Sequence, residues 1–135
     1  MPDATLRNLD SAQRYLKAIE SGATGSALAA FFAPDVVQEE FPNRIAPKGA
    51  QRDLAGLLEG ALRGQSVLSA QHYQVRNRIA SGDQVALELE WTGTLAVAFG
   101  ELQPGSKLRA HIAVLLEFTE GKIKAQRNYD CYEPW

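Results

Sequence analysis

Four polar side chains fall on one face of the last predicted strand, at residues 122–132. Because successive side chains of a strand point to opposite faces, Gln126, Asn128, Asp130 and Tyr132 share one face. A row of two amides, a carboxylate and a phenol either faces water or lines a pocket. In a pocket, Asp130 is the residue of this row best suited to carry a proton.

Composition and charge limit the class of partner. The chain has 135 residues, 45% of them hydrophobic and 22% charged, which is typical of one soluble domain over residues 1–135. The formal net charge is -2 and no run of Lys or Arg occurs, so nothing favours binding to nucleic acid or to an anionic membrane. No apolar stretch is long enough to span a membrane, and the first residues lack a signal-peptide pattern. We therefore expect neither nucleic acid nor a membrane as partner, and a cytoplasmic location.

The sequence predicts neither a metal nor a cofactor. His72 and His111 lie far apart, with no Cys or carboxylate at ligand spacing. Cys131 is the one cysteine, so no internal disulfide is possible, which favours a reducing compartment. No base adjoins it in the sequence, and we expect it to be a small buried hydrophobic residue rather than a nucleophile.

Helices are predicted first and long strands last. Apolar residues recur at three- and four-residue spacing over 6–22, over 26–33 before Pro34, and over 50–64. A short strand opens the segment between the second and third helices, and a Pro-containing loop ends it. The pattern then changes to alternation, which predicts strands at 66–80, 84–95, 108–118 and 122–132. This order favours an α+β domain with helices on one face of a curved antiparallel sheet, which leaves a cavity at its open end.

Several stretches resemble the nuclear transport factor 2-like superfamily, which includes the SnoaL-like polyketide cyclases, the ketosteroid isomerases and the limonene epoxide hydrolases. They are RYLKAIESG with LAAFFAPDVVQEEF, then PKG, WTGTL, PGSKLRAHIAVLLEFTEGKI and RNYD. The resemblance implies a cone-shaped, cystatin-like fold, in which a bent antiparallel sheet wraps around three N-terminal helices and a deep apolar pocket. It also implies a homodimer through the outer face of the sheet.

The same resemblance suggests roles for Tyr15 and Glu40. In the ketosteroid isomerases the tyrosine at the position of Tyr15 donates a hydrogen bond to the substrate oxygen, and Glu40 falls where those enzymes keep their general base. Alternatively, Tyr15 is an ordinary core tyrosine, and Glu40 is a solvated acid in a loop. Glu39 adjoins Glu40, and one of these two side chains must point outward.

One position departs from the isomerase pattern. Val114 stands where those enzymes keep a protonated aspartate that donates to the substrate oxygen. Loss of such a donor costs about 2.7–4 kcal/mol of barrier, so steroid isomerisation is not expected.

The resemblance places the row of the last strand inside the cavity. In the cyclases and epoxide hydrolases an aspartate from this strand acts as acid or base. Asn128 is unable to exchange protons, so we expect Asp130, two residues further along the same face, to act as the acid or base here. Alternatively, Asp130 is solvated or paired with Arg127 or Arg109. Tyr132 is expected at the mouth of the pocket or simply packed.

The expected apolar contacts of a ligand come from Trp91, Ile112, Val114 and Phe41. His111 alternates with Ile112 and is expected to face outward, toward the dimer surface.

His72 is assigned either to the pocket or to a sheet edge. The wall residues could also belong to an ordinary packed core.

We therefore predict a cofactor-independent acid–base enzyme of the isomerase, cyclase or dehydratase type. It would act on a small, mostly apolar molecule with a carbonyl or hydroxyl group. Glu40 and Asp130 would move protons, while Tyr15, Asn128 and Gln126 would orient the ligand oxygen.

Two other classes of function stay open. One is a non-catalytic ligand-binding or assembly domain of the same fold. The other is a protein-interaction module whose pocket is plugged by Phe31, Phe41 and Trp91.

Overall fold

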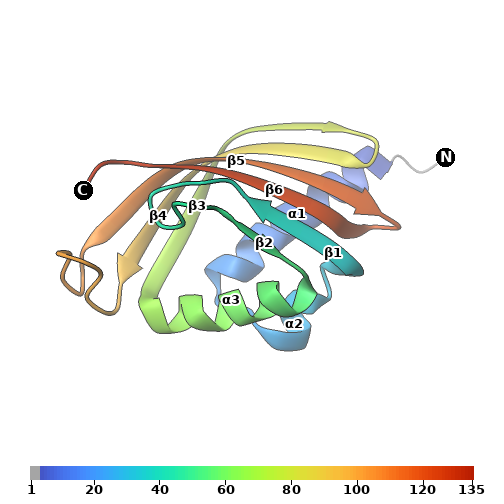
Figure 1. The fold of residues 1–135 in the computed structure, drawn as a ribbon. Coiled ribbons are helices and arrows are strands. Elements are labelled where there is room, and N and C mark those ends of the chain that lie inside the picture. The colour runs from blue at the N-terminus through green and yellow to red at the C-terminus, as the bar shows by residue number, and fades with distance from the viewer. Residues whose placement is uncertain (1–3) are drawn as a thin grey trace.

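A computed structural model describes residues 4–135 (Figure 1). Its elements are α1 (Ala4–Glu20), α2 (Gly25–Ala29), β1 (Phe32–Glu40), β2 (Ala50–Arg52), α3 (Leu54–Val67), β3 (Leu68–Ser81), β4 (Gln84–Leu95), β5 (Lys107–Thr119) and β6 (Lys122–Tyr132). The strands form one sheet in the order β2-β1-β6-β5-β4-β3. Neighbouring strands run antiparallel, except that β1 and β6 are parallel.

The sheet is curved and does not close on itself. Figure 1 shows the strands arching over the helices, with α1 under the concave face and α3 along the open side. The predicted α+β class and the curved, mostly antiparallel sheet are thus confirmed. No helix within residues 4–135 is long and apolar enough to cross a membrane.

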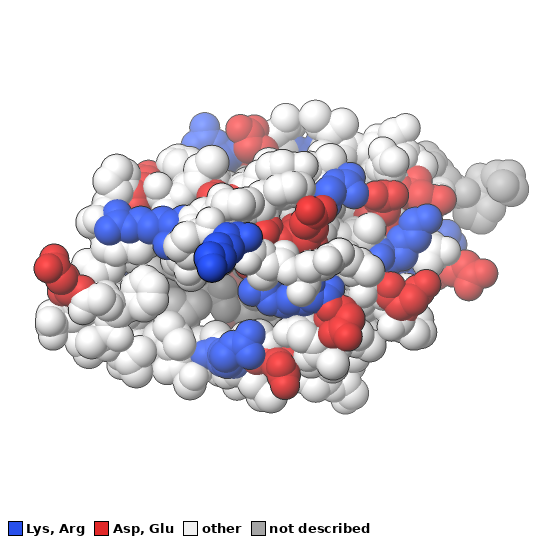
Figure 2. All heavy atoms as spheres, viewed as in Figure 1, with Lys and Arg blue, Asp and Glu red and all other residues white. Residues whose placement is uncertain are grey.

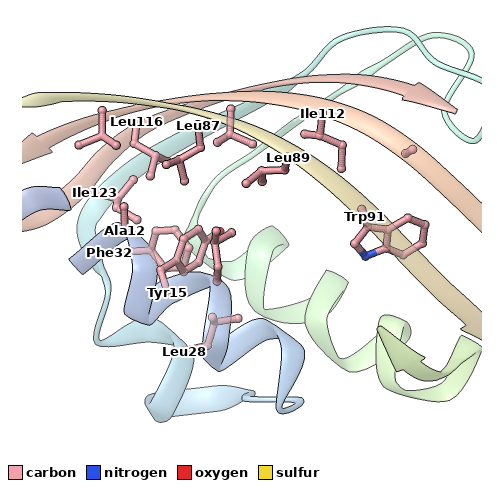
Figure 3. Packing of buried hydrophobic residues seen from close by; sticks show 14 of the residues in the cluster. Ala12, Tyr15, Leu28, Phe32, Leu87, Leu89, Trp91, Ile112, Leu116 and Ile123 are labelled. Carbon is pink, nitrogen blue, oxygen red and sulfur yellow. The ribbon is translucent and has the colours of Figure 1, made fainter. Parts of the chain in front are cut away.

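The core lies between α1 and the concave face of the sheet. Inward residues of β4 and β5 alternate with outward ones, so that Leu87, Leu89, Ile112 and Leu116 project toward α1 (Figure 3). Alternation places a whole apolar set on one face, and burial of that face fixes the register of the strands. The stripe of Leu87 and Leu89 therefore serves both as core and as wall of the space inside the sheet.

The second predicted helix is too long. The helix α2 ends at Ala29, and Phe32 already pairs with Ile123 of β6. The side chain of Phe32 is buried in the core, and this burial outweighs the helical pattern of the sequence. Pro34 lies inside β1, where the register of the β1–β6 pair shifts, and such an irregularity tolerates a residue without an N–H group.

The third predicted helix begins too early. Ala50–Arg52 forms β2, a short strand that pairs antiparallel with the end of β1. The helix α3 starts after Asp53, whose carboxylate accepts a hydrogen bond from the backbone N–H of Gly56 at 2.9 Å. It runs on to Val67, beyond the predicted end. Strand β2 places Arg52 opposite Gln38 and in an ion pair with Glu40.

The long strands match their predictions closely. β4 and β6 have the predicted bounds, and β5 extends the predicted segment by one residue at each end. Two register shifts interrupt β3, as expected of a bulged strand.

Candidate functional site

A cavity of about 640 Å³ lies between the concave face of the sheet and helices α1 and α3. This volume is within the range of small-molecule sites. Figure 2 shows the surface hollowed on this side, with Lys and Arg side chains beside the hollow. Its apolar lining includes Leu16, Ile19, Leu87, Leu89, Trp91, Leu95, Ile112, Val114 and Leu116. The cavity is open, so an interaction module with a plugged pocket does not fit this structure.

The polar row of β6 lines this cavity. Gln126, Asn128, Asp130 and Tyr132 all contribute to its wall. The row therefore faces the cavity inside the curved sheet rather than the outer face of the sheet.

Parallel pairing of β1 with β6 brings a second polar row beside the first. Gln38 lies opposite Gln126, and Glu40 lies opposite Asn128. Arg52 is opposite Gln38 on the other side of β1. Three neighbouring strands thus place amides, carboxylates and the Arg52 guanidinium side by side, and Glu40 of β1 joins the row of β6 in lining the cavity.

Hydrogen bonds join these side chains in a chain. The Tyr15 hydroxyl donates to Gln126 Oε1 at 2.9 Å, and Gln126 Nε2 donates to Asn128 Oδ1 at 2.9 Å. Gln38 Nε2 donates to the same Asn128 oxygen at 2.9 Å. Arg52 Nη1 donates to Gln38 Oε1 at 3.0 Å. Tyr15 is buried, and burial raises the pKa of its hydroxyl, which stays protonated near neutral pH.

Glu40 points inward but is already held by partners. Arg52 Nη1 donates to its Oε1 at 2.8 Å, and Asn43 Nδ2 donates to its Oε2 at 2.8 Å. Glu39 is exposed on the opposite face. Of the two neighbouring acids, Glu40 is therefore the one at the cavity, where it forms a partly buried ion pair.

Asp130 differs from Glu40 because no side chain within residues 4–135 donates to it. Its Oδ1 is buried and has no hydrogen-bond partner. Burial and the nearby charge of Glu40 raise the pKa of Asp130 to about 6, against a smaller opposing effect of Arg52. Such a carboxyl is mostly ionised near pH 7 but readily holds a proton, which suits a general base.

The two arginines considered as alternative partners of Asp130 lie elsewhere. Arg127 pairs with Glu117 at 2.6 Å, and Arg109 is exposed on the outer face of β5. The guanidinium whose charge lowers the pKa of Asp130 belongs to Arg52, which lies on a strand that the sequence pattern did not predict.

Two further phenols face the cavity. Tyr73 and Tyr132 both line it, and burial raises the pKa of each hydroxyl. Neither hydroxyl forms a hydrogen bond to another residue of the part of the chain that the structure describes. Tyr73 is thus a polar member of the wall that the sequence analysis missed. It also missed Gln38 and Arg52, which do not line the cavity but hydrogen-bond the wall residues Asn128 and Glu40.

One predicted site residue, Phe41, and two residues predicted to lie outside the site have their side chains away from the cavity. Phe41 does not line it, because the residue after the inward Glu40 faces outward, and its ring stacks on Tyr129 with centroids 4.6 Å apart. Cys131 is exposed rather than buried, since it alternates with the inward Asp130. His111 points outward, as predicted, and contacts Glu133 at 3.0 Å.

His72 is the other residue whose place was left open. It lies on the edge strand β3, is largely exposed, and contacts Glu20 at 2.8 Å. It is therefore an edge residue. Within residues 4–135, no cluster of three or more His, Cys, Asp or Glu side chains could hold a metal ion.

Trp91 closes one side of the apolar wall. Its indole Nε1 donates to Gln71 Oε1 at 3.0 Å. Two residues on, Gly93 leaves room for the ring, because a Cβ there would lie 2.4 Å from the Trp91 Cη2 atom. The indole ring therefore occupies the space that a side chain at residue 93 would need.

Replacement of Glu40 by Gln is expected to lower the pKa of Asp130 below about 6. The change removes a negative charge that opposes ionisation of Asp130 and leaves the charge of Arg52 uncompensated. Carbon-13 NMR of the Asp130 carboxyl as a function of pH measures the shift. Glu39→Gln removes the same charge on the outer face and is the matched control. An Asp130 pKa that is equal in both variants would contradict the expected influence of Glu40.

Comparison with known proteins gives a consistent result. The family model described as a SnoaL-like domain matches residues 12–126. No curated protein sequence matches the chain.

Among solved structures, IdmH from Streptomyces antibioticus, named as a candidate polyketide cyclase, superposes with a TM-score of 0.76 at 23% identity and covers 91% of each chain. A SnoaL-like polyketide cyclase from Agrobacterium tumefaciens gives 0.67 at 17% identity, covering 91% of this chain and 90% of its own. An LEH-like epoxide hydrolase from M. tuberculosis gives 0.71 at 14% identity, covering 96% and 84%. At these identities the likeness concerns the fold.

Proposed function

Since this chain belongs to the SnoaL-like domain family, we propose that it is an acid–base enzyme acting on a small, mostly apolar molecule with a carbonyl or hydroxyl group. The reaction would be an isomerisation, cyclisation or dehydration, in which a proton moves to or from a carbon next to the carbonyl. The family match and the shared fold support the class of small-molecule chemistry, and the side chains of the cavity support the type of step.

Asp130 carries this proposal. It is a carboxyl with a pKa raised to about 6, set in an apolar cavity and lacking a donor of its own. A base with these properties accepts a proton from a bound ligand at neutral pH and can return it at another position. The low dielectric of the apolar wall strengthens its interaction with the reacting group.

The other polar residues would orient the ligand and tune the base. Asn128, Tyr73 and Tyr132 have donors available to a ligand oxygen, whose developing negative charge they would stabilise. Glu40 would act through its charge, by raising the pKa of Asp130, rather than as a second proton carrier. Tyr15 would hold Gln126 in place instead of contacting the ligand.

The test uses an apolar ketone that fills part of the cavity. α-Tetralone is incubated with the protein in deuterium oxide, and the exchange of its α-hydrogens is followed by proton NMR. We expect exchange faster than in buffer, with a rate that rises with pH, reaches half of its maximum near pH 6 and then levels off, because the carboxylate of Asp130 is the active form. Binding of the ketone without faster exchange at any pH would overturn the proposal.

A non-catalytic ligand-binding domain is the second candidate. The observation that favours it is the internal pairing of the polar wall, since Tyr15, Gln126 and Glu40 all have hydrogen-bond partners within the protein. A wall of this kind can hold a ligand without reacting. The exchange measurement separates the two candidates, because both require binding and only the enzyme requires proton transfer.

Assembly and location stay predictions. A homodimer through the outer face of the sheet would cover Phe41, Tyr129 and the exposed Val37. Sedimentation of the purified protein checks the dimer, and fractionation of the producing cells checks the cytoplasmic location.

A further inference from the structure

The hydrogen-bond chain on the polar wall has a direction, and Arg52 sets it. A guanidinium has donors only, whereas the side-chain amides of Asn and Gln can be turned to present either end. The atom of Gln38 that lies 3.0 Å from Arg52 Nη1 must therefore be the oxygen. This leaves the amino group of Gln38 facing Asn128.

Each following contact then has one possible polarity. The Gln38 amino group lies 2.9 Å from Asn128, so the Asn128 atom there must be the acceptor Oδ1. The side-chain atom of Gln126 at 2.9 Å from that oxygen must be the donor Nε2. The oxygen of Gln126 consequently faces the Tyr15 hydroxyl, which has to donate. One charged donor at the end of the chain thus orients three amides and one phenol.

This direction leaves one donor unused. The Oδ1 of Asn128 accepts two hydrogen bonds, whereas its Nδ2 donates to no other residue of the part of the chain that the structure describes. That nitrogen is not among the buried atoms without a partner, and Asn128 lines the cavity. Its amino group is therefore open to a ligand, two residues from Asp130 on the same face of β6.

We propose that Arg52 and Gln38 are positioning residues that hold the Asn128 amide with its donor toward the cavity, so that the site binds a ligand oxygen acting as hydrogen-bond acceptor beside Asp130. The ligand class is thereby narrowed to molecules that place a carbonyl or similar acceptor at this point of the wall. The inference rests on the proposed function only in taking the cavity as the ligand site.

The reversed arrangement can be made with one nearly isosteric change. In Gln38→Glu, both side-chain oxygens accept, so Arg52 keeps its partner but Asn128 has to turn its amino group toward residue 38. The Asn128 oxygen then faces the cavity, and Gln126 turns in the same sense. Gln51→Glu is the matched control, because it adds the same charge on the neighbouring strand β2, at an exposed side chain that does not line the cavity.

Two ligands of similar shape show whether the Asn128 amide presents its donor or its acceptor to the cavity. α-Tetralone has an acceptor oxygen, and its methylene analogue has a CH₂ group in that place. Tryptophan fluorescence on titration gives the affinity of each. We expect Gln38→Glu to lower the affinity for the ketone by about tenfold relative to the affinity for the hydrocarbon. Loss of one hydrogen bond to a buried acceptor implies a change of this size. Gln51→Glu should leave the ratio of the two affinities as in the unaltered protein. An unchanged ratio in Gln38→Glu would overturn the inference.

Neutron diffraction from the unaltered protein tests the direction without any ligand or variant. Deuterium atoms on Gln38 Nε2 and Gln126 Nε2, both pointing at Asn128 Oδ1, are expected. Deuterium on Asn128 Nδ2 pointing at Gln38 would overturn the inference even if the protein proves to be an enzyme. Conversely, absence of proton transfer to α-tetralone would overturn the proposed function and leave the measured direction of the amides unaffected.

Discussion

Replacement of Asp130 by Asn is expected to lower the rate of α-hydrogen exchange in bound α-tetralone by about 10²- to 10⁴-fold, the range found for loss of a general base. The amide keeps the shape of the side chain but is unable to accept a proton from carbon. The affinity of the variant protein for the ketone should change little, so the loss of activity should appear in the exchange rate at saturating ketone. Proton NMR of the ketone in deuterium oxide gives this rate for both proteins.

The same substitution should stabilise the protein at high pH. The folded-state pKa of Asp130, about 6, lies above its ordinary value of 3.8. The favourable contribution of the protonated carboxyl is therefore complete below the unfolded-state pKa and is lost as pH rises through the folded-state pKa. Above about pH 6 the ionised carboxyl costs stability, by at most about 3 kcal/mol before its partial access to solvent is discounted. Asp130→Asn should thus raise the melting temperature at about pH 8 more than at about pH 4.

Asp35→Asn is the matched control, since it neutralises an exposed acid on β1. It should alter neither the exchange rate nor the pH dependence of melting. Retention of exchange in Asp130→Asn would mean that Asp130 is not the base. A melting temperature lowered at every pH would instead assign it a structural hydrogen bond that the described residues do not show.

Replacement of Phe118 by Ala is expected to cost about 3–5 kcal/mol of unfolding free energy. Phe118 is 1% exposed and lies on the inner face of β5, level with Ile123 of β6. Its ring does not line the ligand cavity, so neither solvent nor ligand fills the space that it leaves. Burial of the ring and the cavity left after its removal both enter this cost.

Urea denaturation followed by tryptophan fluorescence measures this loss. Ile79→Ala removes an apolar side chain that is 63% exposed on β3, and it should change stability by at most about 0.5 kcal/mol. Phe118→Leu should cost less than Phe118→Ala because it keeps most of the volume. Equal stabilities of Phe118→Ala and Ile79→Ala would show that this end of the core is not packed as described.

Much of the fold was predictable because the strands alternate strictly. The strands β4 and β6 match their predicted bounds, since a sheet with one face on the core and one outside imposes a period of two. The same rule identified the row of Asn128 and Asp130. Applied consistently, it also excludes Phe41 and Cys131 from the interior, because each follows an inward acid. The sequence analysis placed Phe41 and Cys131 by residue type instead, and both placements were wrong.

The rest of the site depends on contacts without a local signature. Strand β2 has only three residues, and their pattern continues into the helix that follows, so the position of Arg52 was hidden. Tyr73 was missed because β3 shifts register on both sides of it, and each shift changes which residues face inward. Gln38 acquires its role only through pairing of β1 with β6, which joins segments from opposite ends of the chain.

The parallel contact between β1 and β6 also bears on how the protein folds. Gln38 and Asn128 are separated by 90 positions, and Tyr15 and Gln126 by 111. Contacts of such long range close the largest loops of the chain, and chains dominated by them fold slowly. On the ribosome, β6 is the last strand to emerge, so Asp130 has neither Glu40 nor an apolar wall beside it until synthesis of the domain is nearly complete. The shifted acidity of Asp130 is therefore a late marker of folding, absent from any intermediate in which β6 has not docked.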